Sequence, residues 1–487
     1  MHKFLHEITK RILIFDGSKG YMLQRYGLKG GECPELWNVT HSNIVKEIYS
    51  LYKEAGSDVI QTNTFSGNRV QLEKHGISDR TYELNYEGAR IAREVMGEKG
   101  FVVGSIGPTG ILFEPSGDLT FENAYEIFKE QIKALVDGGV DLINFETFTD
   151  VAEMRAGLFA AKETADIPII CSVSFEQNGR TLMGTDPETA VIILKSLGAD
   201  MVGTNCSFGP ELMVDIVKQM HLAGGEYLSV KPNAGLPEIV NGVPVYKESA
   251  KKFAALANRF VEYGARLIGG CCGTTPEFIR AIKEEIDNRE AINNEETNIT
   301  NFDITSKIIT SKIITSGVKG LDTANITSKN IGELIPKDDE HILNQLADMY
   351  SESVADIVMD LALDMASEDF DAIYVNVDKA FSRKYSKAYS KKDSKIISTE
   401  NAKKNILLAE VINTAQGFAK QPLIIETCSP EALENALRIY KGRAGVIINK
   451  GIDGAGNIEN INSVIINNLV DVANKYGALI IKENIFC

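Results

Sequence analysis

The stretch ADMVGTNCSFGPELMVDIVKQMHLAGGEYLSVKPNAG, residues 199–235, contains one complete strand–helix–strand repeat. Its two ends, 199–207 and 226–235, are short apolar runs that close on polar residues and glycine. The segment between them has apolar residues at helical spacing and ends at a Gly-Gly pair, which is a common stop signal for a helix. This order predicts two parallel strands joined by a crossover helix.

The same rhythm extends in both directions, from residue 11 to about residue 287. The strand-like runs are residues 11–17, 57–65, 101–110, 140–148, 167–175, 199–207, 226–235 and 265–273. Eight such units predict an α/β fold of the (β/α)8 TIM-barrel type, whose catalytic residues lie at the carboxyl ends of the strands. A doubly wound open sheet is the alternative. It usually has fewer strands and a GxGxxG turn after the first one, where this chain has DGSKG.

Composition limits the classes of function. The chain has 487 residues, which favours two domains. Its net charge of −16 argues against binding to nucleic acid or to an anionic membrane, because both need a basic surface. No apolar run is long enough for a membrane span, and the N-terminus MHKFLHEITKRILIF is too charged for a secretory signal. These features predict a cytoplasmic protein.

The character of the sequence changes after residue 287. Residues 288–330 are rich in Asn, Thr, Ser and Ile and contain the near-repeat TSKIITSKIITS, which predicts an interdomain linker. The strand–helix rhythm returns over 331–487 and predicts a second, smaller α/β domain. The basic run at 381–395 is interpreted as a solvated loop. Residues 1–287 therefore form the first predicted domain.

Three of the seven cysteines stand out. Cys206 lies in GTNCSFG and the pair Cys271–Cys272 lies in GGCCGTTPE, at the ends of the sixth and eighth predicted strands. Three thiolates suit a catalytic zinc site that keeps one position open, where a substrate thiol would lose its proton. The alternative is that the adjacent cysteines are apolar fillers or a redox pair. The remaining cysteines, interpreted as structural or incidental, are Cys33, Cys171, Cys428 and Cys487.

Seven motifs, in order along the chain, resemble those of the homocysteine S-methyltransferases. They are DGSKG (16–20), QTNTFSGN (61–68), GSIGPTG (104–110), FETFTD (145–150), GTNCSFGP (203–210), KPNAGLP (231–237) and GGCCGTTPE (269–277). The resemblance covers about residues 8–287, and it is greatest to the N-terminal homocysteine module of cobalamin-dependent methionine synthase. It implies a (β/α)8 barrel that methylates homocysteine to methionine.

The resemblance also implies roles for single residues. The zinc ligands of the family correspond to Cys206, Cys271 and Cys272, and the acids that bind the homocysteine ammonium group correspond to Asp16 and Glu146. For each acid alone, a structural salt bridge or a helix cap is the alternative.

The resemblance implies roles for three further residues as well. The resemblance implies that the substrate carboxylate lies near the backbone N–H groups of Gly104 and Ser105. Asn233 corresponds to a temporary zinc ligand in related methionine synthases, with a simple turn residue as the alternative.

The methyl donor is predicted from the second domain. Residues 331–487 resemble a truncated pterin-binding barrel, too short to close, with Glu426-Thr427-Cys428 at a strand end where the family has a different pattern. Open sheet edges need cover, so self-association or docking on a partner is expected. Asp339-Glu340-His341 matches only part of a corrinoid signature and is interpreted as a chance match.

A methylcorrinoid such as methylcobalamin is therefore expected on a separate protein. The alternatives are betaine or S-methylmethionine as the donor, another thiol or a selenol as the acceptor, and a non-catalytic assembly subunit.

Overall fold

The computed structural model describes eleven stretches of the chain, which contact clustering divides into the units Met1–Ser306 and Lys307–Cys487. The described residues are 2–114, 116–240, 243–295, 313–315, 320–322, 331–334, 353–367, 370–378, 394–419, 421–448 and 463–481. His341, Cys487 and most of the basic run lie outside them. The division falls within the segment expected as a linker, and the predicted domain boundaries remain a prediction.

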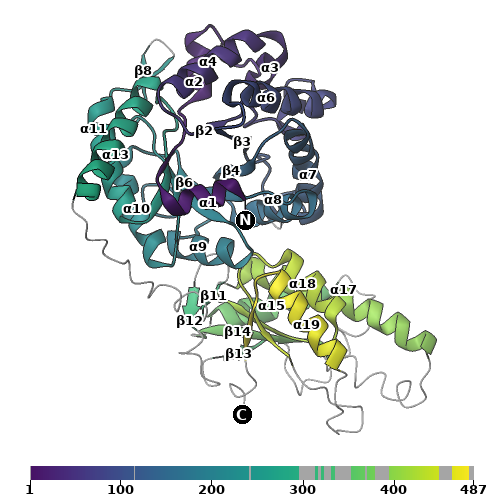
Figure 1. The fold of residues 1–487 in the computed structure, drawn as a ribbon. Coiled ribbons are helices and arrows are strands. Elements are labelled where there is room, and N and C mark those ends of the chain that lie inside the picture. Colours follow the sequence, from purple (N-terminus) through teal and green to yellow (C-terminus); the bar gives the residue numbers. More distant parts are fainter. Residues whose placement is uncertain are drawn as a thin grey trace. The chain divides into compact units, whose positions relative to one another are not determined.

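Eight parallel strands form the centre of the first unit (Figure 1). They are β1 (Leu13–Ile14), β2 (Val59–Gln61), β3 (Phe101–Ile106), β4 (Leu142–Phe148), β5 (Ile169–Val173), β6 (Met201–Asn205), β7 (Leu228–Lys231) and β10 (Ala265–Ile268). Their order in the sheet is β1-β10-β7-β6-β5-β4-β3-β2. A parallel bridge between Phe15 and Val59 joins β1 to β2 and closes the sheet. The predicted (β/α)8 barrel is thus confirmed.

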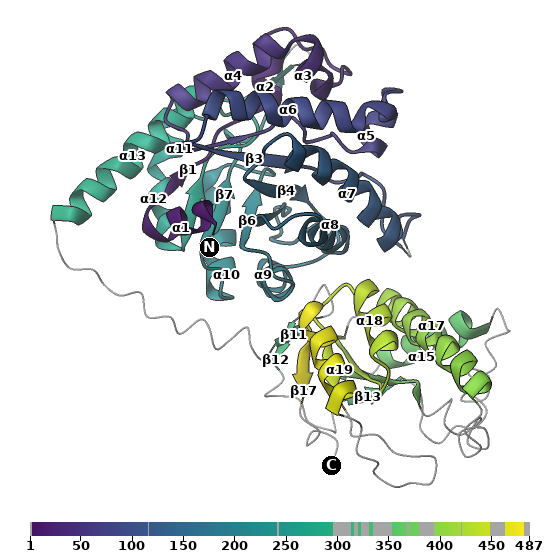
Figure 2. The same cartoon turned by 45° about the vertical axis from the view of Figure 1, so that its right-hand side comes forward.

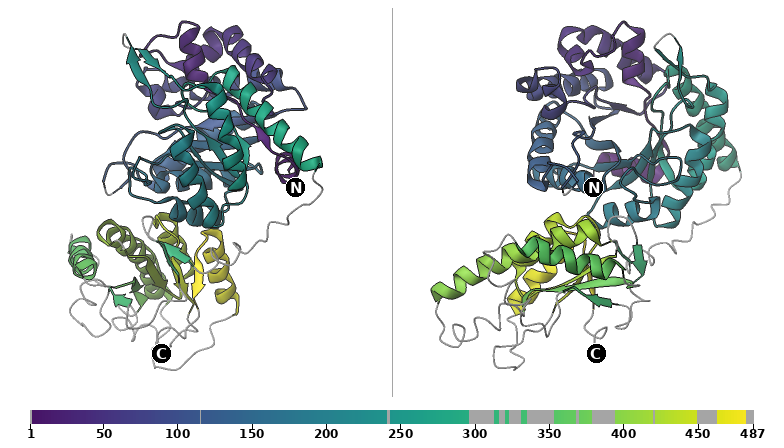
Figure 3. Two further views of the ribbon diagram at one scale, coloured as in Figure 1. Left: turned by 90° about the vertical axis from the view of Figure 1, so that its left-hand side faces the viewer. Right: turned by 180° about the vertical axis from the view of Figure 1, so that it is seen from behind.

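Helices surround this barrel, as Figures 2 and 3 show. The main ones are α2 (Lys19–Arg25), α4 (Ser42–Glu54), α6 (Thr81–Met96), α7 (Phe121–Asp137), α8 (Val151–Thr164), α9 (Pro187–Ser196), α10 (Pro210–Leu222), α11 (Ala250–Ala255), α12 (Ala257–Glu262) and α13 (Pro276–Glu295). Side-chain caps fix several of their first turns: Thr120, Asp150 and Asp186 accept backbone N–H groups of α7, α8 and α9. Gly224 follows α10 with φ of 88°, as its position at a helix stop requires.

The apolar core fills the end of the barrel where the strands begin. Helix α1 (Lys3–Lys10) contributes Phe4 and Ile8 to a cluster with Val59, Phe101 and Leu142, which stand at the starts of β2, β3 and β4. The Phe4 and Phe101 rings meet edge to face with centroids 5.4 Å apart. Asp16, Glu146 and Lys231 lie toward the opposite end of the barrel, where the strands finish.

The second unit contains five parallel strands that pair in chain order. They are β13 (Ile331–Glu333), β14 (Ala372–Asn376), β15 (Leu423–Glu426), β16 (Gly445–Ile447) and β17 (Leu479–Ile481). The helices α15 (Ser353–Ser367), α17 (Ser394–Phe418), α18 (Pro430–Ile439) and α19 (Ser463–Lys475) lie between them in sequence. A smaller α/β domain is therefore present, as predicted. The strands β11 (Ile313–Thr315) and β12 (Gly320–Asp322) form an antiparallel pair.

None of the helices in the described part of the chain is long and apolar enough to cross a membrane.

Close packing between β6 and β7 gives a stability prediction. A Cβ atom at Gly203 would lie 2.5 Å from the Ser229 carbonyl oxygen of β7, so Gly203→Ala should destabilise the barrel by about 1–3 kcal/mol. Trp37 is the only tryptophan and lies in the first unit, so its fluorescence during urea denaturation reports on that unit alone.

Gly20→Ala is the matched control. Gly20 lies in α2 with no neighbour within 4 Å of an added Cβ, so alanine should raise stability by about 0.5–1 kcal/mol. Equal urea midpoints for Gly203→Ala and the unmodified protein would contradict this account of the strand packing.

Candidate functional site

The three cysteines singled out above lie together at the end of the barrel where the strands finish. Cys206 follows β6, and Cys271 and Cys272 follow β10 after two glycines. Their sulfur atoms all lie within 4.8 Å of one another, and the Cys206 and Cys272 sulfurs are 3.8 Å apart. Among the described residues, this is the one group of three or more Cys, His, Asp or Glu side chains close enough to hold a metal ion.

The chain that continues β7 brings the two cysteine segments together. The Cys206 N–H donates to the Lys231 carbonyl at 3.1 Å, and the Cys271 N–H donates to the Pro232 carbonyl at 2.7 Å. The Ala234 N–H in turn donates to the Cys272 carbonyl at 2.9 Å. Because β7 lies between β6 and β10 in the sheet, its extension serves as a common neighbour for both segments.

Asn233 stabilises the same turn. Its side-chain oxygen accepts the Cys272 N–H at 3.0 Å, and its own N–H donates to the Phe208 carbonyl at 3.1 Å. Its side chain also hydrogen-bonds to Cys206. In this arrangement Asn233 positions the cysteines, and its expected role as a temporary metal ligand remains a prediction.

The electrostatics of the sulfur cluster favour a bound cation. The thiols of Cys271 and Cys272 donate hydrogen bonds to Cys206, which lowers the pKa of Cys206 to about 3. The hydrogen bond with Cys206 raises the pKa of Cys271 to about 11, and Cys206 and Cys271 likewise raise the pKa of Cys272. Three thiolates at this spacing repel one another, so all three need a positive charge between them. The donor set fits a zinc ion, which prefers sulfur ligands in a four-coordinate shell.

Backbone strain is concentrated beside the cysteines. Thr147, Cys206 and Ser207 have φ values of 63°, 65° and 63°, a conformation that costs non-glycine residues free energy. Asn205 holds Thr147 in place: its oxygen accepts the Thr147 N–H at 2.9 Å, and its amide donates to the Thr147 hydroxyl at 2.8 Å. The same amide lies 3.7 Å from the Cys271 sulfur.

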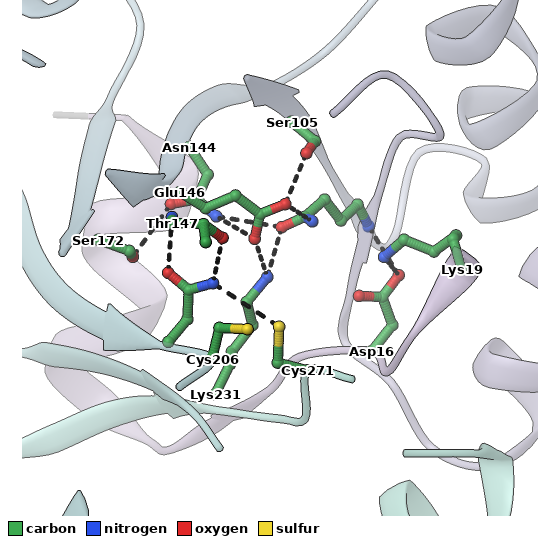
Figure 4. Close-up of polar contacts among 12 residues, drawn as sticks. Asp16, Lys19, Ser105, Asn144, Glu146, Thr147, Ser172, Cys206, Lys231 and Cys271 are labelled. Atoms are coloured by element: carbon green, nitrogen blue, oxygen red, sulfur yellow. Dashed lines mark hydrogen bonds and ion pairs between the residues drawn. The ribbon is translucent and has the colours of Figure 1, made fainter. Parts of the chain in front are cut away.

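Glu146 reaches the interior of this site from β4, as Figure 4 shows. One carboxylate oxygen accepts hydrogen bonds from the Gln61 amide and the Ser105 hydroxyl. The other is 2.5 Å from the Lys231 ammonium group and 3.5 Å from the Asn144 amide. Four donors from the protein therefore surround Glu146, so it has less capacity for a substrate ammonium group than the sequence suggested.

Lys231 was not predicted as a site residue, although it stands in the quoted KPNAGLP motif. It is buried, contacts Glu146 and the Gln61 side chain, and lies 4.5 Å from the centre of the Phe15 ring. Burial alone would lower the pKa of Lys231, but the negative charges of Glu146 and Cys271 outweigh it and raise that pKa. A buried lysine at the end of an apolar strand needs an acidic partner, which is the signal that could have revealed it.

Asp16 is paired with a second unpredicted lysine. Its Oδ2 atom accepts from the Lys19 ammonium group at 2.7 Å and from the Gln61 N–H at 2.9 Å. Its Oδ1 atom is buried and accepts no hydrogen bond. Burial is the largest influence on both groups: it raises the pKa of Asp16 and lowers that of Lys19.

Ser105 and Gly104 differ in their relation to the site. The Ser105 hydroxyl faces Glu146, but its N–H already donates to the Thr62 hydroxyl at 2.9 Å. A Cβ at Gly104 would meet Ile143 and Leu135, so that face of Gly104 packs against α7. The geometry therefore provides no free Ser105 N–H for a substrate carboxylate.

Tyr246 is a further residue that the sequence reasoning missed. Its ring packs over Gly273, and its hydroxyl interacts with Cys272. Burial and the neighbouring sulfurs raise the pKa of Tyr246. It precedes α11, in a segment without a recognisable motif.

Glu153 gives a pH-dependence prediction for the loop beside the site. Its carboxylate accepts both the N–H and the hydroxyl of Thr109 at 2.6 Å, and burial raises the pKa of Glu153 from 4.5 to about 7. A raised folded-state pKa contributes stability below pH 4.5 that is lost as the pH rises through 7. Glu153→Gln should remove this loss, which amounts to at most about 3 kcal/mol.

The measurement is the urea midpoint, monitored by Trp37 fluorescence, at pH 5 and pH 8. We expect the stability advantage of Glu153→Gln over the unmodified protein to be larger at pH 8. The exposed Glu98→Gln is the control and should follow the unmodified profile. A constant difference across this range would show that Glu153 keeps the same protonation state throughout.

The barrel is similar in sequence to known proteins. Residues 13–286 match the sequence model of the family described as homocysteine S-methyltransferase. The methionine synthase of Mycobacterium tuberculosis is 33% identical over 304 residues, which cover 58% of this chain and 25% of that protein. The methionine synthase of Mycobacterium leprae is 32% identical over 298 residues, covering 57% and 24%. This chain thus spans about a quarter of the length of these relatives.

Among solved structures, the chain is similar to the metallated form of the homocysteine methyltransferase MmuM from Escherichia coli. The two are 22% identical with a TM-score of 0.49, over 58% of this chain and 98% of that one.

Proposed function

Because this chain belongs to the homocysteine S-methyltransferase family, we propose that it transfers a methyl group to the sulfur of homocysteine and forms methionine. The family match spans the whole barrel, including all three clustered cysteines and both predicted acids. The observation that carries the proposal is the convergence of three sulfurs within 4.8 Å at the catalytic end of the barrel.

We propose zinc as the metal, with Cys206, Cys271 and Cys272 as its protein ligands. When bound, zinc would lower the pKa of a substrate thiol in its open coordination position and so supply a thiolate at neutral pH. Lys231 offsets negative charge beside the cluster, since it is buried and its charge is felt at Cys271. Asn233 and Asn205 hold the two cysteine segments in position through the hydrogen bonds described above.

The chain's own residues would orient the amino acid. Of the two predicted acids, Asp16 has a buried carboxylate oxygen, Oδ1, without a donor, so this atom is the proposed partner of the homocysteine ammonium group. Glu146 would act through Lys231, which it holds at 2.5 Å. The homocysteine sulfur, without its proton, would attack the methyl carbon in line, and the bonding pair would leave with the donor.

For the donor, we propose a methylcorrinoid carried by another protein. The support is the resemblance of the seven motifs to the homocysteine module of cobalamin-dependent methionine synthase, together with the curated relatives named methionine synthase. The second unit is proposed to be a truncated pterin-binding-like domain. Its five parallel strands in chain order are the arrangement expected of part of a barrel, and its open edges would dock on a partner or a second copy.

The first prediction concerns the metal. We expect the full-length protein to bind one zinc ion per chain, and Cys206→Ser and Cys272→Ser each to weaken zinc binding by at least about 100-fold. Competition with a chromophoric chelator measures the affinity. Cys428→Ser, in the second unit, is the control and should bind zinc like the unmodified protein. Undiminished zinc binding by both barrel variants would refute the proposed ligand set.

The second prediction concerns the donor. Zinc-loaded protein mixed with homocysteine should form methionine from methylcobalamin, and neither from betaine nor from S-methylmethionine. Chromatographic detection of methionine is the assay, and the Cys272→Ser variant is the matched negative control. Formation of methionine from S-methylmethionine or betaine would contradict the proposed donor and identify that compound as the donor instead. Failure with all three donors would favour a non-catalytic assembly subunit.

A further inference from the structure

Four charged side chains are buried together beside the sulfur cluster. We call Asp16, Lys19, Glu146 and Lys231 the charge cluster; none of the four is more than 9% exposed. It contains two acids and two ammonium groups, and Gln61 links the two acid–lysine pairs by donating to both carboxylates. Each acid thus already has an ammonium partner from the chain, so a substrate ammonium group cannot be recognised by unpaired acids alone.

The two pairs are not equally complete. Glu146 accepts four donors, and Lys231 donates to both Gln61 and Glu146. Asp16, by contrast, keeps Oδ1 buried without a donor. The Lys19 ammonium group makes one hydrogen bond, to Asp16 Oδ2, out of a capacity of three. The Asp16–Lys19 pair therefore has one carboxylate oxygen that can still accept a hydrogen bond and an ammonium group that can still donate two.

A buried acceptor without a donor destabilises the folded protein. This arrangement therefore points to a ligand that donates a hydrogen bond to Asp16 Oδ1. The ligand must bring a hydrogen-bond donor to Asp16 Oδ1, and an anionic acceptor would use the remaining donors of Lys19. The backbone N–H of Ser105 cannot serve that anion, because it is bonded to Thr62. Lys19, which contacts Asp16 and has two donors left, is then the positive group that an anion bound next to Asp16 would meet.

Resting on the function proposed above, we propose that Lys19 binds the α-carboxylate of the thiol substrate while Asp16 Oδ1 binds its α-ammonium group. The substrate class is then an α-amino acid with a thiol side chain. Such a molecule presents both charges on one carbon, which matches an acid and a lysine that touch each other. With the ligand bound, its α-ammonium group would face Asp16 and its α-carboxylate would face Lys19, so each of these four charges would have an opposite partner.

This arrangement selects against thiols that lack either group. A mercapto acid without the amine leaves Asp16 Oδ1 without a donor and adds one net negative charge to the buried Asp16–Lys19 pair. An aminothiol without the carboxylate leaves the remaining Lys19 donors unused and adds one net positive charge to the pair. Buried polar groups left without partners are a strong basis for rejection of an analogue.

The test is isothermal titration calorimetry on zinc-loaded full-length protein without a methyl donor. The ligands are L-homocysteine, 3-aminopropanethiol, which lacks the carboxylate, and 4-mercaptobutyrate, which lacks the amine. Lys19→Met should weaken L-homocysteine binding by about 10- to 100-fold, the usual effect of losing a charge-assisted hydrogen bond. The unmodified protein should bind 3-aminopropanethiol weakly, and Lys19→Met should not weaken that binding, because it removes a cation that competes for Asp16.

The exposed Lys29→Met, on the loop after α2, is the matched control and should bind all three ligands like the unmodified protein. Lys19→Arg should restore most of the lost affinity, because it keeps a positive donor next to Asp16. Trp37 fluorescence melts verify that each variant is folded.

Other outcomes would overturn the proposal in distinguishable ways. If Lys19→Met weakens the binding of L-homocysteine and of 3-aminopropanethiol equally, Lys19 does not bind the carboxylate and only positions Asp16. Tighter binding of 4-mercaptobutyrate than of L-homocysteine would show that Asp16 and Glu146 pair only with the lysines and do not bind a substrate ammonium group. If L-homocysteine shows the Lys19-dependent binding but no donor methylates it, the proposed reaction fails while the recognition site stands. If L-homocysteine does not bind the unmodified protein, both proposals fail.

Discussion

The carboxyl end of strand β7 is the constraint on which the site depends. Cys206 and Cys272 lie 66 positions apart in the sequence, yet their sulfurs are 3.8 Å apart because both segments bond to the chain that continues β7. Such contacts arise only when β6, β7 and β10 are neighbours in one parallel sheet. The site therefore depends on the pairing of these three strands, and a change in their register would separate the sulfurs.

The electrostatic organisation of the site follows from burying charges of both signs in a small volume. Two carboxylates and three thiols could not share this region as anions without compensation, since repulsion grows as the local dielectric constant falls. Lys231 contacts Glu146, and the negative charges of Glu146 and Cys271 raise the pKa of Lys231. Lys231 therefore interacts with both the carboxylates and the sulfur cluster. Lys19 and Asp16 form the less complete half, with one acceptor open.

The strained backbone beside the cysteines has a structural explanation in the surrounding hydrogen bonds. Thr147 and Cys206 both adopt positive φ, and neither is glycine. The Asn205 side chain holds Thr147 through two hydrogen bonds, and the β7 extension holds Cys206 through its N–H. Conformations of this kind persist where neighbouring structure over-determines them, and here that structure is the rigid sheet and its apolar core.

Much of the fold could be predicted from the sequence, because it depends on local pattern. The eight runs with their intervening helical segments predicted the barrel, and the motif GGCCGTTPE together with GTNCSFGP predicted which cysteines would meet. Both inferences rest on periodicity and on the rule that parallel strands end at one face of a barrel. The resemblance to the homocysteine S-methyltransferases rests on the same short motifs, and the family match over residues 13–286 confirms it.

Only the tertiary structure decided how the predicted acids are used. Asp16 and Glu146 look equivalent in the sequence, but one keeps an open oxygen and the other is surrounded by four donors. Lys19 and Lys231 lie inside quoted motifs. The position of Lys231 at the end of an apolar strand was a sign of burial, but nothing in the sequence shows which acid each lysine contacts. The number of hydrogen bonds that each acid accepts depends on which side chains from distant strands lie next to it. Residue spacing along the chain does not determine those neighbours.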